Sequence, residues 1–178
     1  MFSVLRKKKK PEPKNILVIR FSSIGDIVLT TPVLRCIKHR YPNTTLHFLV
    51  KEKFKNVVID NPYIDTIHTF DNNLEETIAS VSKTQFDYII DLHKNWRSLR
   101  VKQALKTKAF SFPKLNFQKW LYTTFKWNTL PDKSIVERYF EAVKKIDVKN
   151  DGQGLDYFIP EEKATSTKDI PFGHINGF

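Results

Sequence analysis

The strongest constraint on the fold is a regular alternation of short apolar runs with segments of helical spacing. The runs are rich in β-branched residues and lie at Ile16–Arg20, Leu46–Val50, Thr66–Phe70 and Tyr88–Leu92, with a weaker one at Ala109–Phe112. Short strands that alternate with helices are typical of βαβ units and a parallel sheet. Right-handed crossovers on both faces of such a sheet predict a doubly wound, Rossmann-like α/β fold with the strand order 3-2-1-4-5.

The segments between these runs have the spacing of amphipathic helices. Thr31 and Pro32 fit the N-cap and first position of a helix that ends near Tyr41. Pro32 also prevents a helix from running unbroken from Gly25. The other helical segments are a short turn at Phe54–Val58 and helices at Leu74–Lys83, Arg97–Lys106 and Ser134–Ile146.

We expect three parts along the chain. Residues 1–14 form a basic tail, residues 15–150 form the Rossmann-like domain, and the polar residues 151–178, with several Gly and Pro, form a linker. No apolar run is long enough for a membrane-spanning helix, and the N-terminus lacks the pattern of a secretory signal. A single cysteine, Cys36, rules out a disulfide framework. Together these features predict a cytoplasmic protein.

The net charge of +11 is concentrated in two stretches of the chain. One is the basic tail, and the other is residues 92–131, which contain nine lysines and arginines and no acid. The second stretch also holds all three tryptophans, Trp96, Trp120 and Trp127. Basic residues interleaved with aromatics suit an anionic partner such as nucleic acid, a phosphorylated glycan or a membrane surface. A solvated basic face over an aromatic core would have the same composition.

Two loops of the predicted fold are expected to meet at one site. In this strand order the sheet changes direction between its first and fourth strands, and ligands bind at the carboxyl ends of the strands there. The first loop, Phe21–Asp26, offers hydroxyls, backbone N–H groups and a carboxylate, and the second, His93–Ser98, offers cations and an indole. The candidate binding residues in and beside these loops are Arg20, Ser22, Ser23, Gly25, His93, Lys94, Asn95 and Arg97.

The residues of the first loop alone leave the role of Asp26 open between helix capping, which they favour, and catalysis. The loop has one glycine, so it matches neither the dinucleotide-binding fingerprint nor the P-loop. The five histidines show no metal-ligand spacing, so no metal site is predicted. His47 and His68 are expected to be structural, and for Asp91 a structural and a functional role are equally supported.

Three segments resemble glycosyltransferase family 9, which contains the lipopolysaccharide heptosyltransferases. They are Asn15–Val50, Phe86–Leu105 and Ser134–Ile146. The most specific part is a strand followed by Arg, then Ser-Ser-x-Gly-Asp and Thr-x-Pro-x-Leu. The family's His-x-Val-Glu/Asp-Arg segment appears here with Ser134 in place of the histidine and ends in Arg138. The resemblance covers roughly residues 15 to 147.

This resemblance implies the N-terminal half of a two-domain GT-B glycosyltransferase whose active site lies between two Rossmann-like halves. It implies an inverting, metal-independent transfer, in which this half binds a lipid-linked anionic glycan and the other half binds a nucleotide-sugar such as ADP-heptose. Asp26 would be the general base that takes the proton of the acceptor hydroxyl. Arg20 would meet an acceptor or donor phosphate, and Arg138 joins the candidate binding residues. No cofactor is expected beyond the donor.

On this interpretation the donor-binding half is missing from the chain, and we expect the chain alone to be inactive. The basic, aromatic stretch would hold a phosphate-rich acceptor and lie peripherally against the inner membrane, where each cation adds about 1 kcal/mol. Two alternatives stay open. A nucleic-acid-binding module lacks any recognised motif, so nucleic acid is the less favoured partner. A small nucleotide-binding Rossmann-like module would lack a Gly-rich phosphate loop.

Overall fold

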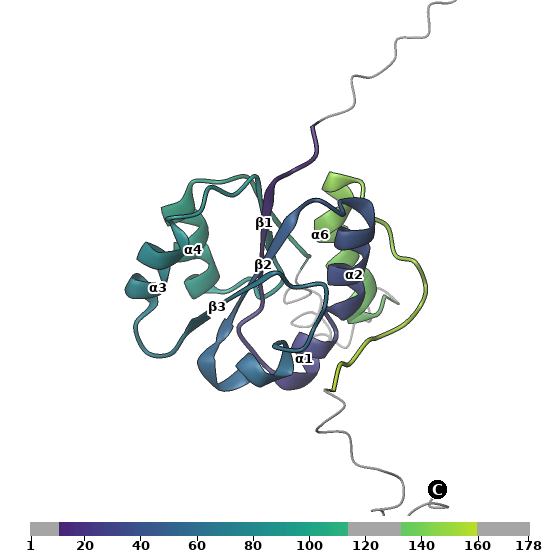
Figure 1. Cartoon of the computed structure of the whole chain (residues 1–178), viewed down its shortest axis with the longest axis horizontal. Helices are drawn as coiled ribbons and strands as arrows, with labels where there is room; N and C mark the ends of the chain where they lie inside the picture. Colours follow the sequence, from purple (N-terminus) through teal and green to yellow (C-terminus); the bar gives the residue numbers. More distant parts are fainter. Residues whose placement is uncertain (1–10, 114–132, 160–178) are drawn as a thin grey trace, which may run out of the picture.

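A computed structural model describes residues 11–113 and 133–159 of the chain. Within these residues five parallel strands form one sheet with the order β3-β2-β1-β4-β5 (Figure 1). The strands are β1 (Asn15–Ile19), β2 (Thr45–Lys51), β3 (Thr66–Phe70), β4 (Tyr88–Asp91) and β5 (Ala109–Ser111). The predicted Rossmann-like α/β fold and its strand order are confirmed.

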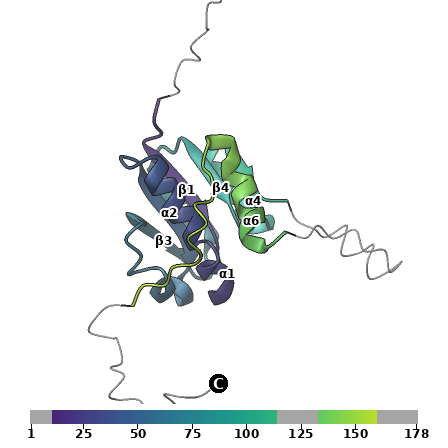
Figure 2. The same ribbon diagram turned by 90° about the vertical axis from the view of Figure 1, so that its right-hand side faces the viewer.

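Helices cover both faces of this sheet. The α-helices are α1 (Ile24–Val28), α2 (Thr31–Arg40), α3 (Leu74–Val81), α4 (Trp96–Leu105) and α6 (Ile135–Val143), and the 3-10 helices are η1 (Glu52–Val57) and η2 (Lys144–Ile146). Figure 1 shows α2 and α6 on one face of the sheet, with α3 and α4 on the other, and Figure 2 shows α2 and α6 side by side from in front. Each predicted helical segment therefore corresponds to a helix.

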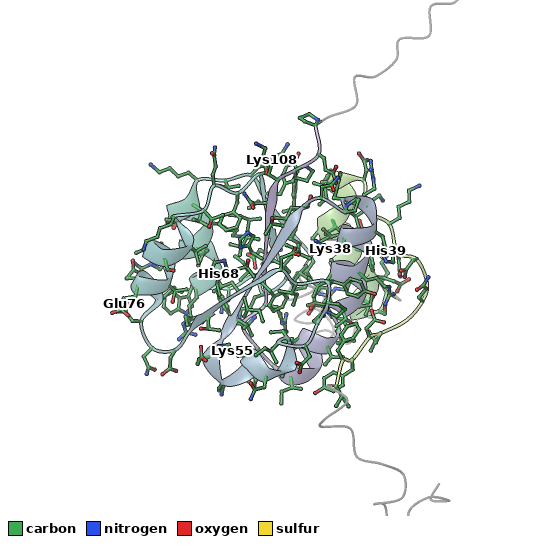
Figure 3. All side chains as sticks on the ribbon, viewed as in Figure 1. Lys38, His39, Lys55, His68, Glu76 and Lys108 are labelled. Carbon is green, nitrogen blue, oxygen red and sulfur yellow. The ribbon has the colours of Figure 1, made fainter. Side chains whose placement is uncertain are left out.

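The strands are apolar at nearly every position because both faces of the sheet are buried. In β1, Ile16 and Val18 pack into the layer under α2 and α6. Leu17 and Ile19 pack into the opposite layer, under α3 and α4. Among the charged side chains of the described residues, Arg20, Arg35 and Asp91 are buried, whereas others, such as Lys55 of η1 just after β2, are at least partly exposed (Figure 3). The carboxyl ends of the strands are thus the place where polar chemistry can gather.

The junction of α1 and α2 differs in one detail from the prediction. The helix α2 begins at Thr31, so its N-cap residue is Thr30, and neither hydroxyl caps α2. Instead both hydroxyls donate back to α1, from Thr30 Oγ1 to the Ile27 carbonyl at 2.6 Å and from Thr31 Oγ1 to the Val28 carbonyl at 2.8 Å. The predicted capping role of Thr31 is therefore wrong, and the two threonines fasten α1 to α2.

Residues 148–159, which we call the strap, contain no helix or strand but are held against α2. Arg35 of α2 is only 2% exposed. Its guanidinium binds both carboxylate oxygens of Asp151, with Nε–Oδ2 at 2.7 Å and Nη2–Oδ1 at 2.8 Å, and it also binds Asp156 and the Gly154 carbonyl. The first part of the predicted linker is therefore attached to the domain.

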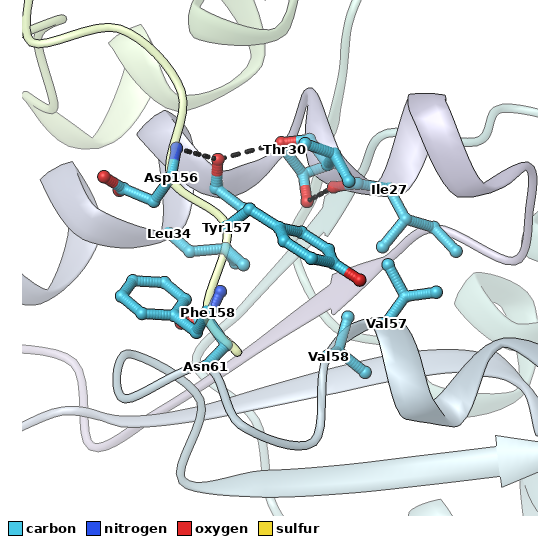
Figure 4. A pocket seen from close by; sticks show the side chains of 11 residues that line it. Ile27, Thr30, Leu34, Val57, Val58, Asn61, Asp156, Tyr157 and Phe158 are labelled. Atoms are coloured by element: carbon cyan, nitrogen blue, oxygen red, sulfur yellow. Dashed lines mark hydrogen bonds between the residues drawn. The ribbon is translucent and has the colours of Figure 1, made fainter. Parts of the chain in front are cut away.

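The far end of the strap reaches α1. The backbone N–H of Asp156 donates to Thr31 Oγ1 at 3.0 Å, and Tyr157 lines a small pocket together with Ile27 and Val57 (Figure 4). The strap therefore runs along α2 to the edge of the sheet where the first predicted loop lies. Residues 1–10 of the predicted tail, residues 160–178 of the predicted linker, Trp120 and Trp127 lie outside the described residues.

Candidate functional site

Arg20 links the two loops that were predicted to meet. It follows β1 and is 8% exposed. Its Nη1 donates a hydrogen bond of 2.6 Å to the carbonyl of Leu92, which follows β4. Its Nη2 lies 2.5 Å from Oδ2 of Asp26 on α1. The guanidinium therefore joins the carboxyl ends of β1 and β4, at the point where the order of the strands reverses.

Asp26 combines a helix-capping position with an accessible carboxylate. Its Oδ2 accepts hydrogen bonds from the backbone N of Ser23 at 3.3 Å and from Ser23 Oγ at 3.0 Å. Burial alone would raise the pKa of the Asp26 carboxyl, but Arg20 and the Ser23 hydrogen bonds outweigh burial, and the pKa lies below its ordinary value. The side chain is still 38% exposed. The geometry is therefore compatible with both of the roles weighed for Asp26.

The rest of the first loop faces solvent. Ser23 and Gly25 are exposed, and Ser22 is half-buried. A Cβ atom placed on Gly25 would meet no other atom within 4 Å. The fold itself therefore does not require a glycine at this position, and the space beside its backbone is open to a ligand.

The second loop is organised by Asp91, which is fully buried at the end of β4. Its Oδ1 accepts hydrogen bonds from the backbone N atoms of His93 at 3.1 Å and Lys94 at 2.7 Å. Its Oδ2 accepts from Ser98 Oγ at 2.9 Å and pairs with Lys102 Nζ at 2.7 Å. These contacts give Asp91 a structural role, because they hold the loop and α4 to the end of β4.

Two of the predicted binding residues point toward the chain after β5. Lys94 Nζ donates to the carbonyl of Phe112 at 3.1 Å. Arg138 of α6 donates from Nη2 to the carbonyl of Pro113 at 2.9 Å. Both cations therefore hold the backbone that follows β5, and among the described residues neither forms a hydrogen bond or ion pair with Arg20 or Asp26.

The other predicted residues of the second loop have separate surroundings. Asn95 caps α4, because its side-chain oxygen accepts a hydrogen bond of 2.9 Å from the first turn of that helix. The His93 ring packs against the Phe21 ring at a centroid distance of 4.8 Å. The Arg97 guanidinium lies 4.8 Å from the centre of the Trp96 ring. His93 therefore contacts the first loop directly, because Phe21 belongs to that loop.

An open hollow of about 290 Å³ lies at the carboxyl ends of β2, β3 and β4, and we call it the cationic groove. It is lined by Lys51, Lys53, Phe70, Asp71, Asn72, Leu74, Trp96 and Arg97. Phe21 connects the groove to the first loop, because its carbonyl accepts a hydrogen bond from Lys51 N at 3.2 Å and its ring packs on Phe70. Trp96 is 58% exposed, so its ring is available to a ligand.

Sequence reasoning missed four polar residues of the cationic groove. Lys51, Lys53, Asp71 and Asn72 lie at the ends of β2 and β3 or directly after them. The rule that ligands bind at the carboxyl ends of parallel strands was applied only to the first and fourth strands. Applied to all strands, it would have found these residues.

Tyr139 of α6 was also missed. It is fully buried, and the Arg20 guanidinium carbon lies 5.8 Å from the centre of its ring. Burial raises the pKa of Tyr139 to about 12, so its hydroxyl stays protonated at neutral pH. In the sequence its place in the apolar stripe of α6 marks it as a core residue, and no local signal relates it to Arg20.

The two histidines expected to be structural contact each other. His47 Nδ1 lies 2.9 Å from His68 Nε2, and burial lowers the pKa of His47 to about 4 and also lowers that of His68. Within the described ranges, no cluster of three or more His, Cys, Asp or Glu side chains is arranged to bind a metal ion. The same part of the chain contains no helix that is long and apolar enough to cross a membrane.

Comparison of the sequence with curated proteins finds lipopolysaccharide heptosyltransferases. Lipopolysaccharide heptosyltransferase 1 of Campylobacter coli is 26% identical over 162 residues, an alignment that covers 83% of this chain and 47% of that protein. No protein-family profile matches the chain. The chain therefore spans about half the length of this relative.

Comparison with solved structures finds the same kind of protein. A glycosyl transferase family 9 protein from Veillonella parvula has a TM-score of 0.65 at 22% identity, over 85% of this chain and 46% of that chain. The Escherichia coli heptosyltransferase WaaC, solved with ADP, has a TM-score of 0.62 at 17% identity, over 80% of this chain and 50% of that chain. These likenesses show that the Rossmann-like fold of this chain matches half of each of the two structures.

Proposed function

Because the chain resembles glycosyltransferase family 9 in sequence and in fold, we propose that it forms the acceptor-binding half of an inverting, metal-independent glycosyltransferase. The donor is a nucleotide-sugar such as ADP-heptose, and the acceptor is the core region of lipopolysaccharide. Since the chain matches about half of its relative, catalysis needs a second, donor-binding half, and the 178-residue chain alone is expected to be inactive. The observation that carries the proposal is the accessible Asp26 carboxylate, paired with Arg20 at 2.5 Å where the strand order reverses.

In the proposed reaction Asp26 acts as the general base. The acceptor hydroxyl gives its proton to the carboxylate while its oxygen attacks the anomeric carbon of the donor. The bond from that carbon to the nucleoside diphosphate breaks, the leaving group takes the electron pair, and the configuration inverts. The Asp26 carboxyl is ionised at neutral pH, as an ordinary aspartate is, and its lowered pKa is consistent with this, so the carboxylate can accept a proton when the acceptor arrives. Because the contacts from Arg20 and Ser23 end on Oδ2, we assign the proton transfer to Oδ1.

The cationic groove supports an anionic glycan as the acceptor. Lys51, Lys53 and Arg97 offer positive charge to phosphate or carboxylate groups, and the exposed face of Trp96 offers a surface on which a sugar ring can pack. The connection through Phe21 places the groove next to the loop that carries Asp26. A glycan bound in the groove would therefore present a hydroxyl to the first loop.

We extend the proposal to the place where the acceptor is found. A lipid-linked acceptor is anchored in a membrane, so the protein would associate peripherally with the cytoplasmic face of the inner membrane. Lys102 pairs with Asp91 and Arg100 pairs with Glu75, so it is the other cations of residues 92–131 that favour an anionic surface, at about 1 kcal/mol for each one that approaches it.

The test is transfer of radiolabelled heptose from ADP-heptose to a lipid A core acceptor by a full-length enzyme that contains this chain. Asp26→Asn should lower kcat by about 10²- to 10⁴-fold, because the amide cannot accept the proton. Asp60→Asn, at an exposed position, is the matched control and should leave turnover unchanged. Near-normal turnover by Asp26→Asn would return Asp26 to helix capping, and turnover by the isolated chain would refute the need for a second half.

A further inference from the structure

Arg20 contacts a third element besides the two loops of the site. Its guanidinium meets Leu92 at the end of β4, Asp26 on α1, and the ring of Tyr139 on α6. The Arg20 Nε and the Tyr139 hydroxyl are both buried without a hydrogen-bond partner among the described residues. A buried hydroxyl without a partner lowers stability, so packing alone would favour phenylalanine at position 139. The hydroxyl therefore does not stabilise this cluster, and what Tyr139 offers to Arg20 is its ring.

The orientation of the Tyr139 ring is fixed by its neighbours. The ring meets the Phe112 ring edge to face at a centroid distance of 5.0 Å. The Arg138 guanidinium, which donates to the Pro113 carbonyl, lies 5.5 Å from the centre of the Phe112 ring. The end of β5 and the first turns of α6 thus hold the ring in place, with Arg20 beside it.

A ring in this position affects how Arg20 pairs with Asp26. The face of an aromatic ring attracts a guanidinium group, and the attraction is stronger where water is excluded. The ring also shields Arg20, which is 8% exposed, so that its attraction to Asp26 acts in a medium less polarisable than water. Without the ring, the long arginine side chain would gain freedom to turn toward solvent.

We propose that Tyr139 is a positioning residue for the Arg20–Asp26 pair, and that its ring holds the guanidinium where it reaches both the Leu92 carbonyl and the Asp26 carboxylate. The catalytic meaning of this contact rests on the proposed function, in which Asp26 is the base. The contact itself is a property of the fold. Through it, a helix near the far end of the described chain adjusts the acid strength of a carboxyl near the beginning.

The first experiment measures the pKa of the Asp26 carboxyl by following its ¹³C NMR signal during a pH titration of the whole 178-residue chain. Charged groups that act on this cluster are Arg20, Asp26 and Arg138, and all three remain in every variant. Tyr139→Leu and Tyr139→Met should both raise the pKa of Asp26 toward its ordinary value, because Arg20 loses its fixed orientation. Tyr139→Phe keeps the ring and should leave the Asp26 pKa nearly unchanged.

Phe140→Leu is the matched control, since Phe140 is the next residue of α6 and lies in the same core layer. It should lower the melting temperature without moving the Asp26 pKa. If the Tyr139 variants lower the melting temperature as Phe140→Leu does and also leave the Asp26 pKa in place, Tyr139 only fills space and the proposal is overturned. Because Tyr139→Leu and Tyr139→Met differ in shape, the Asp26 pKa can still be compared with that of the unaltered chain if one of the two variants fails to fold.

The second experiment uses the full-length enzyme and separates this proposal from the proposed function. If both hold, Tyr139→Leu lowers kcat by about tenfold, shifts the acidic limb of the pH–rate profile to higher pH, and leaves the KM for the donor unchanged. If Asp26→Asn keeps its activity while Tyr139→Leu still raises the carboxyl pKa, the positioning role stands and the assignment of Asp26 as the base is wrong.

Discussion

Arg20 Nη2 and Asp26 Oδ2 lie 2.5 Å apart, so the cation that follows β1 and the acid of α1 act as one unit across a single loop. The same arginine also holds the Leu92 carbonyl at 2.6 Å. Serving both partners at once requires a planar group with several donors in fixed directions, which arginine has and lysine lacks. This double contact gives the first prediction.

Arg20→Lys should disturb the site although it preserves the charge. The ammonium group cannot reach both partners in the same geometry, so the pKa of Asp26 should rise toward its ordinary value. A lowered carboxyl pKa stabilises the fold fully above the ordinary value of 3.8, and this stabilisation is lost as the pH falls through the lowered pKa. Arg20→Lys should therefore lose this contribution at neutral pH, and the difference should disappear at low pH. An NMR titration of Asp26 checks the shift, and an unchanged Asp26 pKa in Arg20→Lys would contradict the prediction.

Gly25→Ala should have opposite effects on the stability of the fold and on the binding of a ligand. Since no atom lies within 4 Å of a Cβ at this position and Gly25 is within α1, alanine should stabilise the fold by about 0.5 to 1 kcal/mol. The added methyl group occupies the space beside the loop, so binding of a phosphorylated glycan acceptor should weaken. Thermal unfolding and acceptor titration measure the two effects. A destabilised variant would show that the glycine serves the backbone and not a ligand.

The His47–His68 pair should make stability depend on pH at mildly acid values. The pKa of His47 is about 4 in the folded chain and near 6.5 when unfolded, so the unfolded chain binds more protons between these values. The unfolding free energy should therefore be level above about pH 6.5, and His47 alone should lower it by about 3 kcal/mol as the pH falls to 4. His68, whose pKa is also lowered, should add to this loss. Urea unfolding across this range measures it, and the double variant His47→Leu, His68→Leu should lose the dependence.

The Arg35 ion pairs should respond unequally to loss of the cation and loss of the acids. The Arg35 side chain is 3% exposed, whereas those of Asp151 and Asp156 are 20% and 25% exposed. When the partner is lost, the acids can recover contact with water and the arginine cannot. The double variant Asp151→Asn, Asp156→Asn should therefore lower the unfolding free energy by about 3 to 5 kcal/mol, which is more than Arg35→Met should. Chemical denaturation measures the difference. Equal costs would mean that the strap detaches and hydrates Arg35.

The sequence predicted the sheet well because the physical signals for it are local. Each strand, such as β1, is buried on both faces and reads as a continuous apolar run, and the order of the strands follows from the handedness of the crossovers. The meeting of the two loops at Arg20 follows from the same topology. The strand order thus explains why the two loops lie together, but the cation that pairs with Asp26 is Arg20, which follows β1, and not a cation of the second loop.

The contacts that the sequence did not reveal join residues that are far apart in the chain. Tyr139 lies in an ordinary apolar stripe of α6, and only the packing of that helix brings its ring to Arg20. In the sequence, Arg35 is a charge on a helix and Asp151 lies in a polar, linker-like segment. Only the structure shows that the two side chains bind each other. Lys94 was expected at the site because it lies in the second loop. Its backbone is left-handed, however, and its ammonium group donates to the carbonyl of Phe112.

The strap has a mechanical consequence. Its Asp156 N–H donates to Thr31 Oγ1, and that hydroxyl in turn donates to the Val28 carbonyl at the end of α1, so two hydrogen bonds connect the strap to the helix that carries Asp26. Arg35 of α2 holds the strap at Asp151 and also at Asp156, the residue whose N–H binds Thr31. A displacement of the strap at Asp156 would therefore act on α2 through Arg35 and on the end of α1 through Thr31, next to the proposed base.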